Sequence, residues 1–294
     1  MICGAVPVRG VADIRRALEA PTPCVEYRLD YAERVDEQMM QALREAVEKK
    51  VAIFTVRRRE EGGAWRGTEE ERIRLYASLL DLRPHYIDVE AESPAARELA
   101  PSGGTKVIAS RHDFEQTPPL EVLMQWGRKA AEVGDVVKIA TYARSPADGL
   151  RVLSLIGALE KPTVAFAMGP HGVYTRLAAA ALGSPIMYVS LGEATAPGQT
   201  TPDAYYAGLL AIGLAPQGQD LSTLREALDW VDGALMHLLK RRLEICRDIG
   251  RIKKAAGLPI YDDEREAKVL KRAGDFKQLF EILVQMCKAV QIVA

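Results

Sequence analysis

A lysine stands in the middle of an apolar stretch, DVVKIATYA, at residues 135–143. Burying an ammonium group is costly, so Lys138 is a poor choice for stability and would tend to lose its proton there. A neutral amine is a nucleophile toward carbonyl groups and forms a Schiff base. The iminium draws electrons from the neighbouring carbon, so that a nearby base can remove an α-proton.

A histidine that suits this role follows another strand-like run, KVIASRHDF. A histidine side chain ordinarily has a pKa of about 6.5, so His112 could take a proton and return it to a leaving hydroxyl. Acidic partners such as Glu26 and Glu61 would orient the lysine and the imidazole.

Three arginines, Arg28, Arg57 and Arg176, could bind a substrate carboxylate through forked hydrogen bonds. Together these residue types indicate a Schiff-base lyase or aldolase that acts on an anionic keto substrate. Catalytic groups of a parallel barrel lie at the carboxyl ends of its strands, where several of these residues fall.

Short apolar runs alternate with amphipathic segments up to about residue 213. The predicted strands are Ile2–Val8, Cys24–Asp30, Val51–Arg57, Tyr86–Glu90, Lys106–His112, Val136–Tyr142, Thr163–Met168 and Ile186–Leu191. Eight strands with intervening helices predict an α/β fold, a (β/α)8 barrel. An open doubly wound sheet is the alternative, although no GxGxxG follows the first strand.

The pattern changes after GLAPQGQD, residues 213–220, which reads as a linker. One helix of about 35 residues, from 222 to about 257, would be about 52 Å long and therefore needs a partner. Two shorter helices follow. We predict a barrel over residues 1–216, a linker at 217–220 and an all-helical domain of three helices at 221–294 that dimerises.

Composition narrows the possible functions. The net charge is −1, so nothing indicates binding to nucleic acid or to an anionic membrane. The chain shows neither an apolar run long enough to span a membrane nor a signal peptide. Four widely spaced cysteines predict reduced, buried thiols in a cytoplasmic protein. The lack of asparagine and the many arginines and glutamates hint at a thermophile. We expect no metal and no cofactor.

Six segments then resemble one family in order and spacing: EYRLD, FTVRRREEGG, VIASRHDFEQTP, VVKIA, GVYTRLAAAALGSP and EATAPGQ. They are similar to type I 3-dehydroquinate dehydratase, a barrel enzyme that converts 3-dehydroquinate to 3-dehydroshikimate. The resemblance implies that Lys138 forms the Schiff base, that His112 is the general acid and base, and that Glu61 pairs with His112. It also implies substrate-binding residues: Glu26, Arg28, Arg57, Arg176, Thr195 and Gln199. Thr195 stands where the family often has serine.

The C-terminal segments LREALDWVD, LLKRRLEICRDIGRIKKAAGLPIYDDEREAKVL and LFEILVQMCKAVQ resemble the all-helical class of chorismate mutase. In that family each site takes an arginine from the partner chain. The resemblance implies a chorismate site made of Arg225, Arg242, Lys253, Asp262, Arg265, Glu266 and Gln291. Arginines would clamp the two carboxylates, while Lys253 and Gln291 would face the ether oxygen.

The chain departs from the second family in two places. Cys287 replaces a small hydroxyl residue four positions before Gln291, and a thiol is a weaker hydrogen-bond donor. The stretch between DDEREAKVL and LFEIL is about ten residues short, or roughly three helical turns. If each helix of a hairpin loses half of this length, Glu266 and Gln291 remain opposite each other.

These patterns predict a bifunctional, homodimeric enzyme of the shikimate route that acts on 3-dehydroquinate and chorismate. Two alternatives stay open. The barrel could be another Schiff-base enzyme, such as a class I aldolase, although EYRLD and APGQ argue against it. The chain could also be a dehydratase only, with a helical domain that dimerises or binds an effector.

Overall fold

The structure, a computed structural model, describes residues 1–99, 103–211 and 221–293. The chain divides into two compact units, Met1–Gln217 and Gly218–Ala294, which are described separately. The predicted linker at 217–220 lies outside the described residues. No helix within the described ranges combines the length and apolar character that crossing a membrane requires.

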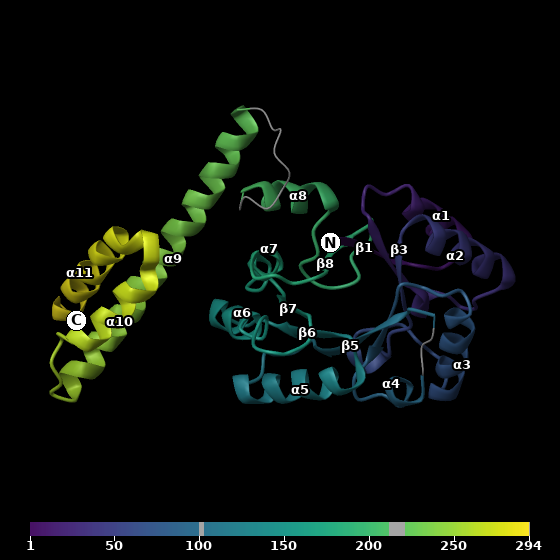
Figure 1. Ribbon diagram of the computed structural model, residues 1–294, viewed down its shortest axis with the longest axis horizontal. Helices are drawn as coiled ribbons and strands as arrows, with labels where there is room; N and C mark the ends of the chain where they lie inside the picture. The colour runs from purple at the N-terminus through teal and green to yellow at the C-terminus, as the bar shows by residue number, and fades with distance from the viewer. Residues whose placement is uncertain (100–102, 212–220, 294) are drawn as a thin grey trace. The chain divides into compact units, whose positions relative to one another are not determined.

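Eight parallel strands form the core of the first unit (Figure 1). They are β1 (Ile2–Pro7), β2 (Cys24–Arg28), β3 (Val51–Thr55), β4 (Tyr86–Glu90), β5 (Lys106–Asp113), β6 (Val136–Tyr142), β7 (Thr163–Met168) and β8 (Met187–Ser190). Neighbours in the chain are neighbours in the sheet, and β8 pairs with β1. In the described residues β7 and β8 share no ladder, so the barrel is nearly closed. The predicted barrel is confirmed, and the doubly wound sheet is not the fold.

Helices connect the strands and cover the outside of the barrel (Figure 1). They are α1 (Val11–Leu18), α2 (Glu37–Lys49), α3 (Glu69–Leu80), α4 (Pro94–Glu98), α5 (Leu120–Val133), α6 (Pro146–Leu153), α7 (Tyr174–Ala181) and α8 (Pro202–Ala211). Local sequence sets several of their first turns. Asp36 accepts a hydrogen bond from the amide of Met39 to cap α2, and Thr68 and Glu71 form a reciprocal capping box at α3.

Period-two alternation decides which strand residues face the barrel interior. On β6, Val137 and Ile139 pack against Leu123 and Ala130 of α5, so Lys138 between them faces inward. Burying each such aliphatic side chain contributes about 1.5–3 kcal/mol. This outer packing fixes the register of the strand, and one residue of slippage would turn the lysine out of the interior.

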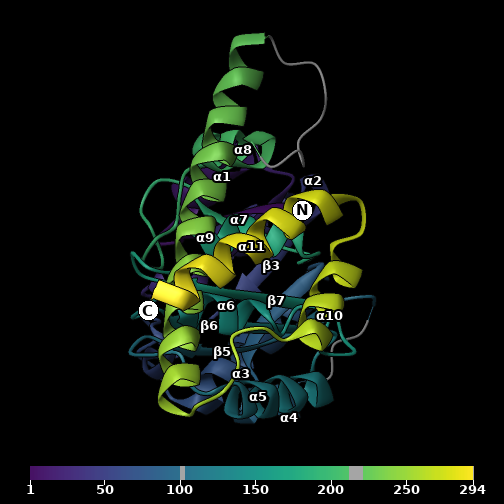
Figure 2. The same cartoon turned by 90° about the vertical axis from the view of Figure 1, so that its left-hand side faces the viewer.

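The second unit consists of helices (Figure 2). They are α9 (Leu221–Ala255), α10 (Asp263–Ala273) and α11 (Lys277–Val293), with a short 3-10 turn, η3 (Gly274–Phe276), between the last two. The helix predicted from residue 222 to about 257 is one continuous helix. The predicted hairpin is short: η3 alone separates α10, which is 11 residues long, from α11.

The prediction of reduced cysteines is wrong. Cys3 is bonded to Cys24, and Cys246 is bonded to Cys287. Sequence spacing could not reveal these pairs, because the partners are 21 and 41 residues apart. Parallel pairing of β1 with β2 places Cys3 directly opposite Cys24.

Candidate active site

Lys138 lies inside the barrel between two carboxylates. Its Nζ is 2.7 Å from Asp88 Oδ2 on β4 and 3.4 Å from Glu26 Oε1 on β2. The ring of Tyr188 on β8 faces the same nitrogen, 3.9 Å from the ring centroid. The aromatic face and the two carboxylates all stabilise a cation at this position. The ammonium is therefore paired with Glu26, a partner that the sequence suggested, and more closely with Asp88, which it did not.

Arg57, just after β3, connects this lysine to the rest of the buried charges. Its guanidinium donates to Asp88 at 2.6 Å, to Glu90 at 3.1 Å and to Ser110 at 2.6 Å. Burial alone would raise the pKa of Asp88, but Arg57 and Lys138 hold that pKa well below its usual range. Arg57 was predicted to bind substrate, and the structure shows that most of its donors already serve this network.

His112, near the end of β5, forms a pair with Glu61. Its Nδ1 lies 3.0 Å from Glu61 Oε2, and its backbone amide donates to the same oxygen at 2.8 Å. Burial, followed by the charges of Arg57 and Lys138, lowers the pKa of His112 well below its ordinary value. The imidazole is therefore neutral near pH 7. With Nδ1–H directed at Glu61, Nε2 carries the free lone pair, which is the state a general base requires.

A glycine makes this pair possible. Glu61 ends a short 3-10 turn, η2 (Arg59–Glu61), and Gly62 follows with a left-handed φ of 74°. A Cβ at Gly62 would lie 2.2 Å from the ring of Phe114, so no larger residue fits there. The backbone can therefore turn tightly enough to bring Glu61 under His112.

Arg176 on α7 has unused donors beside the cavity, where its guanidinium lies 4.3 Å from the ring centroid of Phe166, a lining residue. Its side chain is 4% exposed, Nε and Nη1 have no hydrogen-bond partner, and Nη2 reaches only the carbonyl of Pro197 at 3.3 Å. Burial lowers the pKa of Arg176 to about 10, which still leaves it charged at neutral pH. A buried guanidinium with unpaired donors is a site for an anion, and a carboxylate fits its forked geometry.

The remaining predicted barrel residues line the cavity around Lys138 itself. Arg28 is held by Asp30 through two hydrogen bonds of 2.9 and 2.8 Å, so its fork is occupied. Gln199 Oε1 accepts from the backbone and hydroxyl of Thr195, at 2.8 and 3.1 Å, and closes the loop after β8. The structure thus places eight of the nine predicted barrel residues around one cavity, and the ninth, Arg176, stacks on Phe166 in its wall.

Sequence reasoning missed Asp88, Glu90 and Tyr188. The signal for the first two was present, because YIDVE places its two acids at i and i+2 on one face of a strand, as EYRLD does for its charges. No local pattern marks Tyr188, because its importance comes from the closing of the barrel, which brings β8 near Lys138.

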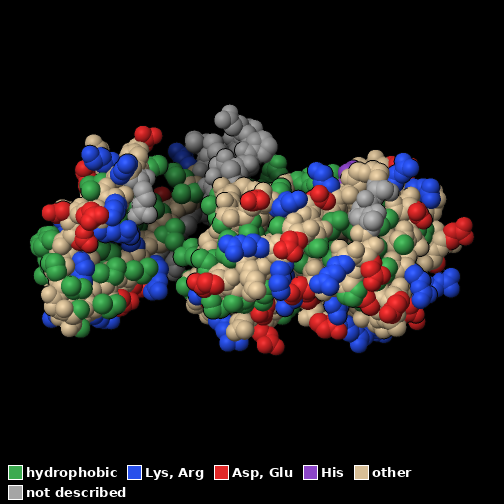
Figure 3. All heavy atoms as spheres, turned by 60° about the horizontal axis from the view of Figure 1, so that its bottom comes forward, with side chains coloured by type: hydrophobic (Ala, Val, Ile, Leu, Met, Phe, Trp, Pro, Cys, Tyr) green, Lys and Arg blue, Asp and Glu red, His purple; other side chains and the backbone are tan. Residues whose placement is uncertain are grey.

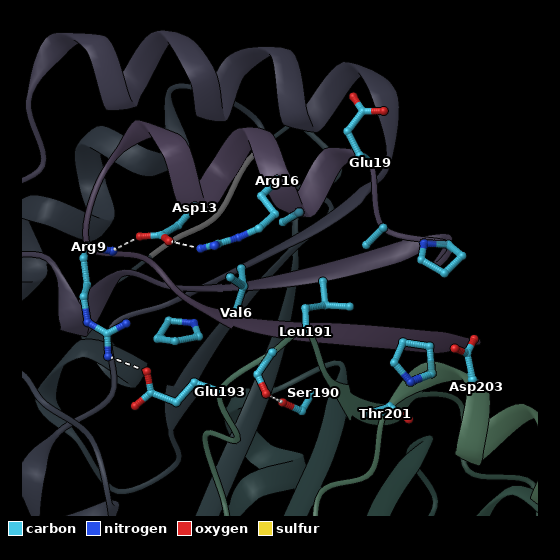
Figure 4. Close-up of a pocket in the computed structure, with 16 residues that line it drawn as sticks. Val6, Arg9, Asp13, Arg16, Glu19, Ser190, Leu191, Glu193, Thr201 and Asp203 are labelled. Carbon is cyan, nitrogen blue, oxygen red and sulfur yellow. Dashed lines mark hydrogen bonds and ion pairs between the residues drawn. The ribbon is translucent and has the colours of Figure 1, made fainter.

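The cavity around Lys138 is only about 30 Å³, which admits water but no organic ring. A larger hollow of about 620 Å³ lies beside α1 and the ends of β1 and β8 (Figure 4). Its two arginines are already paired: Arg9 bonds Glu193 at 2.7 Å, and Arg16 bonds Asp13. Because its lining residues include no lysine, histidine or cysteine, we assign the chemistry to the smaller cavity.

In the helical unit, the predicted residues of α9 are separated along one straight element. Arg225 precedes Arg242 by seventeen residues, or about 26 Å along a continuous helix, so one chain cannot bring them together. Arg242 Nη1 donates to the carbonyl of Leu283 on α11 at 2.7 Å, and burial lowers its pKa. Lys253 Nζ donates to the carbonyl of Ile260 at 2.8 Å.

The remaining predicted residues lie on α10 and α11. Asp262 caps α10 by accepting a hydrogen bond from the amide of Arg265 at 2.9 Å, and both side chains are exposed. Glu266 bonds Lys288, a residue that sequence reasoning missed, at 2.8 Å. Lys288 precedes Gln291 by one helical turn, so Glu266 remains close to Gln291 despite the shortened hairpin.

Comparisons with known proteins match one family to the barrel and another to the helical unit. The family described as Type I 3-dehydroquinase matches residues 4–212, and the family described as Chorismate mutase type II matches residues 224–292. A 3-dehydroquinate dehydratase of Pyrobaculum aerophilum is 70% identical over 100% of this chain and 98% of its own length. One of Methanopyrus kandleri is 37% identical over 63% of this chain and 85% of its own.

Solved structures are similar to the barrel. A 3-dehydroquinate dehydratase of Geobacillus kaustophilus aligns with a TM-score of 0.64 at 27% identity, over 69% of this chain and 87% of that one. A 3-dehydroquinate dehydratase of Aquifex aeolicus aligns with a TM-score of 0.57 at 29% identity, over 70% of this chain and 95% of that one.

Proposed function

We propose a residue-level mechanism for this chain, which belongs to the type I 3-dehydroquinase family and carries a chorismate mutase type II domain after the barrel. The two domains make it a bifunctional enzyme of the shikimate pathway. The barrel is a 3-dehydroquinate dehydratase, which is a lyase, and the helical domain is a chorismate mutase, which is an isomerase.

In the barrel, the Lys138 ammonium gives up a proton and the neutral amine attacks the keto carbon of 3-dehydroquinate. That proton returns to the carbinolamine oxygen, which leaves as water, and an iminium remains. The iminium acidifies the neighbouring C–H, and His112 Nε2 removes that proton. His112 then protonates the departing hydroxyl, which leaves as a second water. Hydrolysis of the iminium consumes one water, so the net reaction is the loss of one water from the substrate.

One observation carries this assignment: a lysine and a neutral histidine line the same cavity, and the free donors of Arg176 lie behind Phe166 in its wall. Arg176 binds the substrate carboxylate, and Asp88, Glu26 and the Tyr188 ring stabilise the cationic iminium. Because the cavity is small, the loop that carries Thr195 and Gln199 must move to admit the substrate.

Replacing His112 with alanine separates the two chemical roles. We expect kcat to fall by about 10²–10⁴-fold, the usual contribution of a general acid–base group. Iminium formation needs only the amine, so borohydride should still label Lys138 in the presence of substrate. Single-turnover kinetics and peptide mass mapping check both points, and loss of labelling together with turnover would contradict this division of roles.

In the helical domain, the rearrangement of chorismate needs no nucleophile, only a compact substrate conformer and charge at the breaking ether bond. Arg242 and a partner's Arg225 clamp the two carboxylates, while Lys253 and Gln291 face the ether oxygen. Glu266, together with Asp262 and Arg265 at the start of α10, completes the site.

The helical domain assembles a homodimer. Leu228, Leu235 and Leu238 on α9 are between 45% and 58% exposed in the single chain, and hydrophobic side chains gather on the surface of this unit (Figure 3). A partner chain would cover this stripe and would supply the distant Arg225.

Subunit mixing tests this arrangement. Arg225→Met and Arg242→Met homodimers should each lack mutase activity, because every site has lost one clamp. Hybrids formed by subunit exchange contain one intact site, so mixing should restore part of the activity. Light scattering should give twice the chain mass. A monomer, or no recovery after proven exchange, would leave the helical domain without a shared site.

Both reactions proceed without a metal or cofactor in this mechanism, and we place the enzyme in the cytoplasm with its small-molecule substrates. The purified, EDTA-dialysed protein should dehydrate 3-dehydroquinate and convert chorismate to prephenate. Dehydration without chorismate conversion would make the helical domain a dimerisation or effector-binding module. Inactivity toward 3-dehydroquinate would instead favour another Schiff-base reaction, such as that of a class I aldolase.

A further inference from the structure

The second disulfide lies in the seam between α9 and α11. It joins Cys246 to Cys287, which are 41 residues apart in sequence. One turn earlier on both helices, Arg242 bonds the carbonyl of Leu283, again 41 residues away. The constant offset shows that the two helices run in the same direction in a fixed register.

One turn after the disulfide, Gly250 lies against Gln291. A Cβ at Gly250 would be 2.8 Å from Gln291 Cα, so the helices are in close contact here. The disulfide therefore lies directly beside the glutamine that the mutase mechanism directs toward the ether oxygen.

The amide of Gln291 is only half satisfied. Its Nε2 donates to Cys287 Sγ at 3.0 Å, whereas its Oε1 is buried and has no hydrogen-bond partner. A disulfide sulfur carries no proton and can only accept a hydrogen bond. The sulfur therefore holds the N–H side of the amide, and the carbonyl oxygen is turned away from it without a donor.

Reduction changes what this sulfur can do. A Cys287 thiol can donate to Gln291 Oε1, which satisfies the unpaired oxygen once the amide rotates by half a turn. Rotation would release Nε2 from the sulfur and place its two N–H donors where the carbonyl oxygen had been. A carbonyl oxygen facing the ether oxygen of chorismate is repulsive, whereas an N–H donor stabilises the charge that develops there.

We propose that the Cys246–Cys287 disulfide sets the orientation of the Gln291 amide, so that the mutase site is weakened when the disulfide is formed and active when it is reduced. Cys287 is then a positioning residue that acts through Gln291. This inference rests on the proposed mutase function and deepens it, and the barrel site is untouched by it.

The chemistry is a thiol–disulfide exchange. A small dithiol attacks one sulfur, and the disulfide gains two electrons and two protons to give two thiols while the dithiol closes into a cyclic disulfide. Cys246 is 4% exposed and Cys287 is half-buried, so Cys287 is the more exposed residue of the pair. A small-molecule disulfide, such as oxidised glutathione, reverses the reaction.

The test compares the full-length protein after treatment with dithiothreitol and after treatment with oxidised glutathione. Mass labelling with a maleimide counts the thiols in each form. We expect the reduced form to have a mutase kcat at least about tenfold higher, a conservative part of what one preorganised donor supplies, with a smaller change in KM. Dehydratase activity in the same samples reports any general damage, including reduction of Cys3–Cys24.

Variants isolate the hydrogen bond from the cross-link. Cys246→Ser and Cys287→Ser both prevent the disulfide and leave a donor at position 287, so each should match the reduced wild type even under oxidising conditions. Cys287→Ala also prevents the disulfide but supplies no donor, so its kcat should be lower than that of Cys287→Ser.

Equal mutase rates in the oxidised and reduced forms, or equal rates for Cys287→Ala and Cys287→Ser, would overturn the proposal while leaving the mutase function intact. A faster oxidised form would also overturn it, since the disulfide would then stabilise the active arrangement of the site. If no form converts chorismate, the mutase function fails and this inference fails with it.

Discussion

Replacing Lys138 with methionine is expected to lower dehydratase kcat by on the order of 10⁶-fold, the scale observed when a covalent nucleophile is removed. Methionine keeps the length and apolar stem of the side chain but cannot form an iminium. The mutase domain has its own site, so chorismate conversion should continue at the wild-type rate. Steady-state assays of both reactions on one sample measure this separation.

The same change removes the partner of two buried acids. Asp88 keeps its bond to Arg57, but Glu26 loses its only cation within ion-pair distance among the described residues. An uncompensated buried charge costs about 3–5 kcal/mol, so a lower Tm is expected. Retained mutase activity distinguishes lost chemistry from unfolding. Lys129→Met, which removes only a surface pair with Glu92, is the matched control and should leave both activities unchanged.

Replacing Arg242 with methionine is expected to reduce chorismate conversion by about 10²–10³-fold, the range for losing a preorganised charge at the reacting group. Arg242 lies on the face of α9 that contacts α11, where its guanidinium is held at the carbonyl of Leu283. This position lets it bind a carboxylate without first being ordered. Dehydratase activity should not change.

The neighbouring arginine provides the control. Arg241 is exposed and bonds Glu244 on the same helix, so Arg241→Met removes the same charge from the same turn without touching the seam. We expect its mutase rate to stay within about twofold of wild type, because an exposed ion pair contributes little. If Arg241→Met and Arg242→Met lost equal activity, general charge rather than a defined site would explain the effect.

The barrel could be predicted almost completely from sequence because alternation within the strands carries the necessary information. Val137 and Ile139 must face the helices, which turns Lys138 inward, and the same logic places Glu26 and Arg28 inside. Several observed strand ends differ from the predicted ones by one or two residues, since the last residues of several predicted strands belong to loops.

The partners of the inward residues were harder to predict. Sequence suggested that Arg28 and Arg57 bind substrate, but Asp30, Asp88 and Glu90 hold their donors. These acids come from different strands, and only the register of the closed barrel shows which of them meet. Arg176, by contrast, keeps Nε and Nη1 unpaired within the part of the chain that the structure describes, and its Nη2 donates to the carbonyl of Pro197.

The prediction of reduced cysteines was wrong for a related reason. The expectation of free thiols rested on sequence spacing and on the rarity of disulfides in cytoplasmic proteins. Spacing says nothing about Cys246 and Cys287, which meet only because α11 runs alongside α9 in one particular register. Intracellular proteins of hyperthermophiles are a recognised exception to that rarity, and the lack of asparagine already pointed toward a thermophile.

Trapping the iminium is the most direct test of the central claim, which is that Lys138 binds the substrate covalently. Borohydride added during turnover of 3-dehydroquinate reduces the iminium to a stable secondary amine, and peptide mass mapping locates the added mass. The account predicts one adduct, on Lys138, with loss of dehydratase activity and retention of chorismate conversion. An adduct on another lysine, or full inactivation with Lys138 unmodified, would contradict it.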